Sequence, residues 1–89
     1  MKIRIAGNTE GPCYFVIKSK GFKLKVIYHE EGEYTDFIAL KDDLEISATS
    51  MEELLGLIAM QECRQDDWRL TDDEYKLYSE MKYGDKTLE

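Results

Sequence analysis

The chain has few of the residues from which metal and nucleophilic sites are built. Its 89 residues include one histidine, His29, and two cysteines, Cys13 and Cys63, which stand 50 positions apart. Zinc sites use clustered Cys, His or carboxylate ligands, usually in closely spaced pairs, and a cysteine nucleophile needs a base held beside it. The sequence therefore predicts a protein without a metal, a cofactor or catalytic residues, and argues against an enzyme.

Long apolar runs are also missing. The most apolar stretch, residues 54–60, is far shorter than the roughly 20 residues that a membrane-spanning helix needs. The first residues lack the apolar core of a secretion signal, and thiols of proteins inside the cell stay reduced. We therefore expect a cytoplasmic protein that has free cysteines and does not bind membranes.

One proline and six glycines leave no segment with the composition of a flexible linker. Hydrophobic residues make up 43% of the chain and charged residues 35%, which is enough apolar content for a folded core. We expect a single α+β domain over residues 1–87. The last two residues, 88–89, are expected to be left over from cloning.

Charge divides the chain into two unlike parts. Residues 1–29 carry a balance of +5, whereas residues 30–89 carry −12, which gives the net charge of −7. Such asymmetry within one domain bears on the partners of a protein more than on its fold. A basic front and an acidic remainder favour a protein partner with a basic surface.

Polar and apolar residues alternate along much of the N-terminal half, which is the pattern of half-buried β-strands. In the clearest case, Phe22, Leu24, Val26 and Tyr28 are expected to face the core and the residues between them the solvent. Short connections favour antiparallel hairpins, with Gly21 in a left-handed position. We predict a four- or five-stranded antiparallel meander, with strands at 2–6, 13–18, 22–29, 34–40 and 44–48.

The C-terminal half has the period and the start signals of helices. Ser50 and Glu53 form a capping box before a helix over 51–64, and Thr71 and Glu74 form another before a helix that runs to Lys82, with Gly84 just beyond its end. In the first helix, Met51, Leu54, Leu55 and Ile58 share a face. We expect both helices to pack on one face of the sheet. The expected contacts between them join Leu57 and Met60 to Tyr75, Leu77, Tyr78 and Met81.

The segment between these helices holds the only tryptophan, Trp68, among acidic residues. Aromatic and arginine side chains dominate the binding energy of many protein interfaces, and a negative patch speeds docking to a basic partner. Alternatively, Trp68 plugs the core between the helices, as most tryptophans are well buried. The candidate partner-binding residues are Asp66, Asp67, Trp68, Arg69, Asp72 and Asp73.

These patterns lead to one main hypothesis and two alternatives. The main hypothesis is a small acidic protein-binding module, such as an inhibitor or immunity-type protein that masks a basic partner. The first alternative is a homodimeric or larger structural domain that uses the two-sided apolar helix 51–64. The second is a nucleic-acid binder that uses the basic hairpin of Lys18, Lys20, Lys23 and Lys25, against which the net charge of −7 argues.

Overall fold

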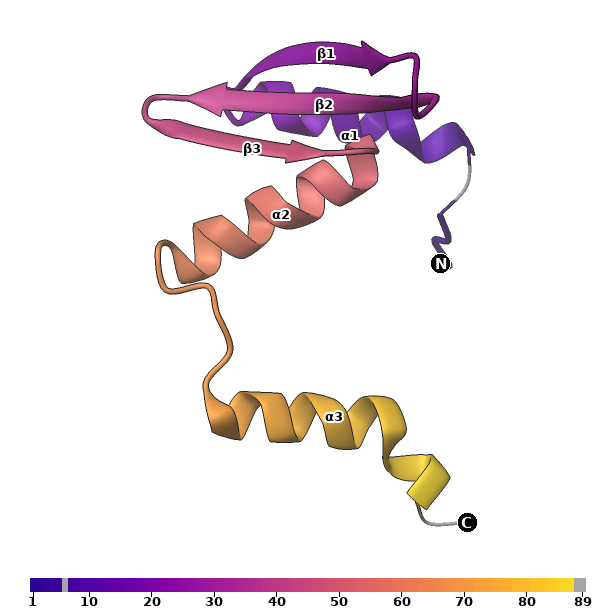
Figure 1. Ribbon diagram of the computed structural model, residues 1–89, viewed down its shortest axis with the longest axis vertical. Helices are drawn as coiled ribbons and strands as arrows, with labels where there is room; N and C mark the ends of the chain where they lie inside the picture. Colours follow the sequence, from indigo (N-terminus) through magenta and orange to yellow (C-terminus); the bar gives the residue numbers. More distant parts are fainter. Residues whose placement is uncertain (6, 88–89) are drawn as a thin grey trace.

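The computed structural model describes residues 1–5 and 7–87, with side chains as far as Gly84, so residues 88–89 lie outside it. The fold is α+β (Figure 1). No helix of the described residues is long and apolar enough to cross a membrane. In chain order the elements are the 3-10 turn Gly7–Thr9, α1 (Glu10–Ser19), β1 (Lys23–His29), β2 (Tyr34–Lys41), β3 (Leu44–Ala48), α2 (Met51–Arg64) and α3 (Asp72–Thr87).

The three strands form one antiparallel sheet in the order β1-β2-β3. Val26 pairs with Phe37 across β1 and β2, and Ala39 pairs with Ile46 across β2 and β3. Asp42 takes a positive φ of 54° in the turn between β2 and β3, where a short polar side chain is tolerated. The expected strands at 22–29, 34–40 and 44–48 are therefore confirmed.

The core lies between one face of the sheet and two helices. α2 packs against β2, β3 and α1, and Leu24, Phe37 and Ile46 on the inner face of the sheet pack against the buried residues. The expected face of α2 is confirmed, since Met51, Leu54 and Ile58 are buried and Leu55 packs beside them. The buried set is Ile17, Phe22, Ala39, Met51, Leu54 and Ile58.

The prediction of a strand at 13–18 was wrong, because these residues form most of α1. Their β-branched and aromatic side chains suit a strand, but Pro12 stands in the first turn of the helix, where its missing N–H costs nothing. Ile17 is buried, and Cys13, one helical turn earlier, packs against the same cluster. Burial at a spacing of four residues outweighs the local preference for a strand.

The meander is also smaller than expected. Residues 2–5 form no strand despite their alternating pattern, and residue 6 lies outside the described residues. The described sheet thus has three strands in place of four or five. Gly21 does take a left-handed φ of 92°, but it joins α1 to β1 and does not close a hairpin.

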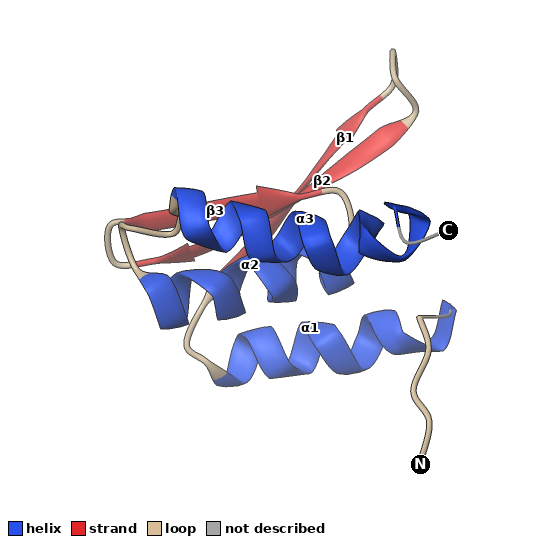
Figure 2. Cartoon of the chain, turned by 90° about the horizontal axis from the view of Figure 1, so that it is seen from below, coloured by secondary structure: helices blue, strands red, loops and turns tan. Residues whose placement is uncertain are grey.

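The far end of the β1–β2 hairpin projects beyond the helices (Figure 2). Val26 and Tyr28 lie on the inner side of β1, where Leu24 is half-buried, yet both are exposed. The expectation that both would face the core was therefore wrong, since no helix of the described chain reaches that end of the sheet.

The position of α3 differs most from the expectation. This helix continues through Gly84 to Thr87, and it forms no packed interface with the sheet, α1 or α2 among the described residues. The expected packing of Leu57 and Met60 against α3 is therefore not seen among the described residues. The Cα radius of gyration is 16.2 Å, whereas a compact domain of this length has about 12 Å.

Removing a core side chain tests the assignment of the core. Leu54→Ala should lower the free energy of unfolding by about 2–5 kcal/mol, because it leaves a cavity between α2 and the sheet. Chemical denaturation followed by circular dichroism measures this change. Ile3→Ala, at an exposed apolar residue, should change it by no more than about 0.5 kcal/mol. Equal effects of the two substitutions would contradict the core described above.

Candidate partner-binding surface

The first capping box fixes the start of α2. The end of this helix then determines where the segment that leads to α3 begins. The Glu53 amide donates to the Ser50 hydroxyl at 3.1 Å, and the Glu53 carboxylate accepts from the hydroxyls of Ser50 and Thr49, each at 2.9 Å. α2 ends at Arg64, because Gln65 takes a positive φ of 55° and leaves the helix. The chain then crosses to α3 through residues 65–71.

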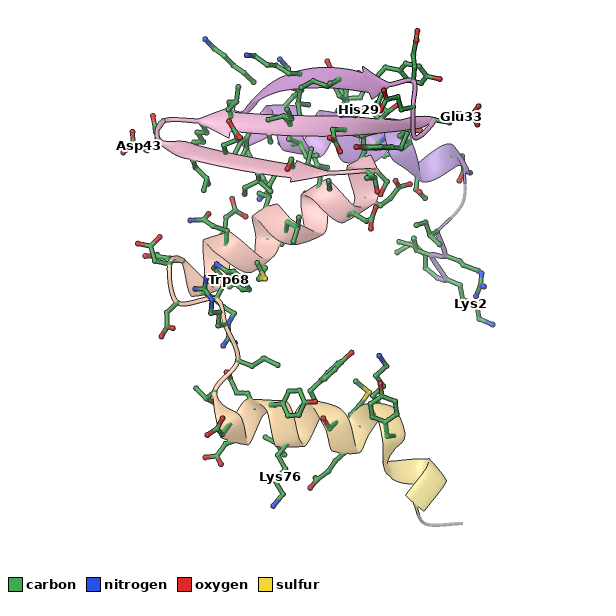
Figure 3. The ribbon with its side chains drawn as sticks, viewed as in Figure 1. Lys2, His29, Glu33, Asp43, Trp68 and Lys76 are labelled. Atoms are coloured by element: carbon green, nitrogen blue, oxygen red, sulfur yellow. The ribbon has the colours of Figure 1, made fainter. Side chains whose placement is uncertain are left out.

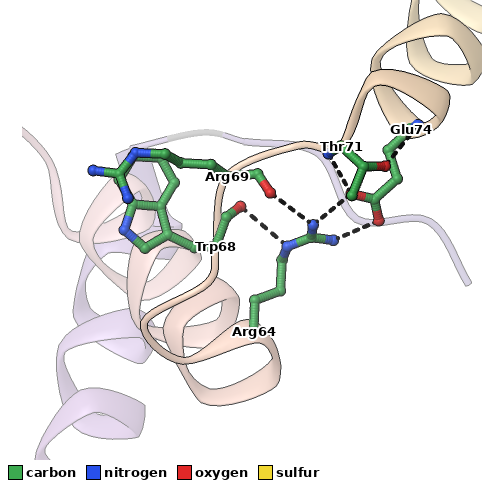
Figure 4. Close-up of polar contacts among 5 residues, drawn as sticks. All are labelled: Arg64, Trp68, Arg69, Thr71 and Glu74. Carbon is green, nitrogen blue, oxygen red and sulfur yellow. Dashed lines mark hydrogen bonds and ion pairs between the residues drawn. The ribbon is translucent and has the colours of Figure 1, made fainter.

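Arg64 holds this crossing segment in place (Figure 4). Its Nε donates to the Trp68 carbonyl oxygen at 3.0 Å, and its Nη2 donates to the Arg69 carbonyl oxygen at 3.1 Å. The same guanidinium donates to both carboxylate oxygens of Glu74, from Nη1 to Oε2 at 3.0 Å and from Nη2 to Oε1 at 2.6 Å. A two-point arginine–carboxylate pair fixes direction as well as distance, so we call these four contacts the Arg64 brace.

Glu74 serves the brace and the start of α3 together. Its carboxylate accepts from the Thr71 amide at 3.0 Å, and its own amide donates to the Thr71 hydroxyl at 3.2 Å. The second capping box is therefore confirmed. Hydrogen bonds from Arg64, and then from the Thr71 backbone, lower the pKa of Glu74 from 4.5 to about 2, so the carboxylate is charged at neutral pH.

Trp68 is 43% exposed, so it does not plug the core between the helices. The guanidinium carbon of Arg69 lies 4.4 Å from the centre of its ring (Figure 4), in the range of a cation–π contact. One face of the indole is therefore covered by a cation from the same segment. A large, partly exposed aromatic side chain is held at the turn between α2 and α3.

The four acidic residues of the predicted site are all exposed. Asp66 and Asp67 follow the end of α2, and Asp72 and Asp73 occupy the first turn of α3. Carboxylates at a helix start are stabilised by the positive end of the helix dipole. The six predicted residues lie along one continuous segment of the chain, which we call the acidic linker (residues 66–73).

Sequence reasoning missed the two residues that organise the acidic linker. Arg64 was expected at the end of a helix, without a role in the linker, and Glu74 was expected in a capping box. A cation in the last turn of one helix and an acid in the first turn of the next were the available signal. Arg64 and Glu74 are ten residues apart on two different helices, so no helical or strand period predicts that they pair. The pairing depends on the path of the linker between the helices.

Other chemically active side chains in the described chain do not form a comparable cluster. His29 Nε2 lies 2.9 Å from Asp36 Oδ2 on the β1–β2 hairpin, and its ring stacks on Tyr34. Burial, and then the charge of Glu52, raise the pKa of the Cys13 thiol above its ordinary value, which disfavours the reactive thiolate. No metal-binding group of three His, Cys, Asp or Glu side chains occurs among the described residues.

Compared with known proteins, the chain matches no family model, no curated protein and no solved structure.

The Arg64 brace should weaken as the pH falls. The lowered pKa of Glu74 means that the brace contributes fully above pH 4.5 and is lost as the pH falls towards about 2. The fluorescence anisotropy of Trp68, the only tryptophan, should fall over that interval as the linker gains motion. In Glu74→Gln the anisotropy should already be low at neutral pH.

Glu53→Gln provides the matched control, because Glu53 caps α2 and does not contact Arg64. Its anisotropy profile should follow that of the unchanged protein. An unchanged profile in Glu74→Gln would show that the pair does not hold the linker.

Proposed function

We propose that the protein is a small, non-catalytic binding module whose acidic linker docks on a basic protein surface. The single observation that carries this proposal is the half-exposed Trp68, stacked on Arg69 in a segment whose acidic residues are all exposed. Tryptophan and arginine are the side chains most often responsible for binding energy at interfaces. Trp68 and Arg69 are the proposed anchors, and Asp66, Asp67, Asp72 and Asp73 form the charged rim.

The Arg64 brace supports this proposal because it orders the linker before any partner arrives. Loops that order only on binding lose roughly 0.5–1.5 kcal/mol of affinity for each immobilised side chain. Here the main chain at Trp68, Arg69 and Thr71 is already held by hydrogen bonds. A preorganised aromatic anchor is therefore available at a lower entropic cost than one in a free loop.

Electrostatics favours a basic partner. Four exposed carboxylates flank the anchors in sequence, on a chain of net charge −7, so the field around the linker attracts positive surfaces and repels negative ones. Charges at the rim act mainly on the association rate and on the choice of partner, while the buried anchor governs dissociation. Masking of a basic target, in the manner of an inhibitor or immunity-type protein in the cytoplasm, is the role that this arrangement fits best.

The test begins with affinity capture from the native host, followed by identification of the bound protein and measurement of its affinity by calorimetry. Trp68→Ala should weaken binding by at least about tenfold, since it removes the anchor. Asp67→Asn should slow association and reduce the dependence of the association rate on salt. The thermal midpoint should barely change in either variant, because both side chains lie outside the core.

Tyr28→Ala is the matched control, since it removes an exposed aromatic side chain at the opposite hairpin. Its affinity for the captured partner should equal that of the unchanged protein. Full-strength binding by Trp68→Ala, or an equal loss in Tyr28→Ala, would contradict the proposed surface.

A further inference from the structure

α3 presents an apolar face that nothing in the described chain covers. Tyr78 is 46% exposed, Leu77 66% and Met81 71%, and their spacing of three and four residues places them on one side of the helix. Lys76 points away from the sheet (Figure 3), and at 100° per residue the apolar face lies on the opposite side of α3. This face is thus turned towards the body of the molecule without packing on it.

An uncovered helix of this kind gains little stability from packing. Isolated helices shorter than about 12–15 residues are marginal in water, and most helical stability in proteins comes from packing an apolar face. α3 has 16 residues, and its capping box and the Arg64 brace support only its first turn. The exposed face of α3 is therefore expected to pack against another apolar surface.

The body offers two apolar surfaces of suitable size, and charge distinguishes them. The outer side of α2 carries the exposed Leu57, one helical turn from the exposed Glu53, whose charge would repel the acids of α3. The outer face of the sheet, opposite the helices (Figure 2), bears the exposed lysines Lys23 and Lys25 on β1. Its apolar residues are Ile27, Tyr34, Ile38 and Leu40, the last two half-buried on the central strand.

The dimensions of α3 match those of this outer face. A helix of 16 residues is about 24 Å long at 1.5 Å per residue, and β2, with eight residues, extends about 26 Å at roughly 3.3 Å per residue. Three strands spaced about 4.8 Å apart span nearly 10 Å, which is the diameter of one helix. One α3 helix lying along β2 would cover the sheet from edge to edge.

Charges on the two flanks of α3 also match the two edges of the sheet. Helical spacing places Asp73 and Glu80 on one flank of the apolar face and Lys82 on the other. If α3 lies along β2 with Asp73 and Glu80 above Lys23 and Lys25 of β1, Lys82 lies above the β3 edge. Glu45 is on the outer face at that edge. Opposite charges thus meet along both edges in a single orientation.

The Arg64 brace favours a sheet from another molecule over the sheet of the same chain. It fixes the first turn of α3 beside the end of α2, and α2 lies on the inner side of the sheet. The connecting segment has only seven residues, at most about 25 Å when fully extended. It would have to abandon the brace and pass around the edge of the sheet to reach the outer face in the same chain.

We propose that two copies of the chain exchange their α3 helices, each helix lying across the outer face of the other copy's sheet. Each helix brings Leu77, Tyr78 and Met81, and a buried aromatic side chain covers about 150–250 Å². With the sheet atoms that they cover, the two helices bury area on the order of 1,200 Å², which is sufficient for a specific interface. This surface is distinct from the exposed indole of Trp68, which stays free in the dimer.

Paired cysteines test the contact directly in a Cys63→Ser background, which removes the exposed native thiol. One chain carries Tyr78→Cys, and a second chain of different mass carries Ile38→Cys. On mixing and mild oxidation, the disulfide between the two chains should form at least about tenfold faster than with Lys76→Cys in place of Tyr78→Cys. Sedimentation equilibrium of the unchanged protein should give a dimer, and circular dichroism confirms that each variant folds.

A charge exchange provides the second arm. Lys25→Glu should raise the dimer dissociation constant by about three- to tenfold, and adding Glu80→Lys should restore it, as expected for exposed pairs repeated by symmetry. A monomer at every concentration would overturn the proposal. So would a disulfide within one chain carrying both Tyr78→Cys and Ile38→Cys, or a dimer whose Tyr78→Cys chain links to Leu57→Cys and not to Ile38→Cys.

Discussion

α1 and α2 build the core of this protein together with the inner face of the three-stranded sheet. Ile17 from α1 and Leu54 and Ile58 from α2 are fully buried there. α3 lies outside the core that the rest of the chain forms (Figure 1). The uncovered apolar face of α3 and the exposure of Trp68 accompany this separate position.

The Arg64 brace gives this external segment its shape. Without it, seven residues between two helices would sample many conformations. With it, one guanidinium satisfies two carbonyl oxygens and one carboxylate, and Trp68 is held where it meets solvent. The two proposals use the same feature in different ways: the ordered linker presents an anchor to a basic partner, while the fixed start of α3 directs that helix towards another molecule.

Local patterns predicted much of the fold. The sequence-based bounds of α2 agree with the structure, because Ser50 and Glu53 mark its start and the apolar period continues to its end. The two later hairpin strands were found through alternation and polar turns. α1 was missed because its valine, isoleucine and aromatic residues suit a strand, while its helical form depends on packing Ile17 against α2 and the sheet. Gly84 did not end α3, since a glycine favours but does not impose a helix stop.

The candidate site could be predicted only in part from the sequence. The six residues of the acidic linker were identified because an isolated Trp–Arg pair among acids is unusual, and their exposure fits that reading. The roles of Arg64 and Glu74 could not be predicted from the sequence, because their pairing across ten residues depends on the path of the linker. The unpartnered face of α3 was likewise hidden, since a sequence shows an apolar helical stripe but not whether another element covers it.

The central claim is that α3 and the acidic linker lie outside the core of the monomer. Hydrogen exchange followed by mass spectrometry, with the chain kept monomeric by dilution, tests it most directly. Amides of β2 and α2 should exchange only through global unfolding, whereas those in the later turns of α3 should exchange orders of magnitude faster. Protection of those α3 amides equal to that of α2 in the monomer would contradict the account.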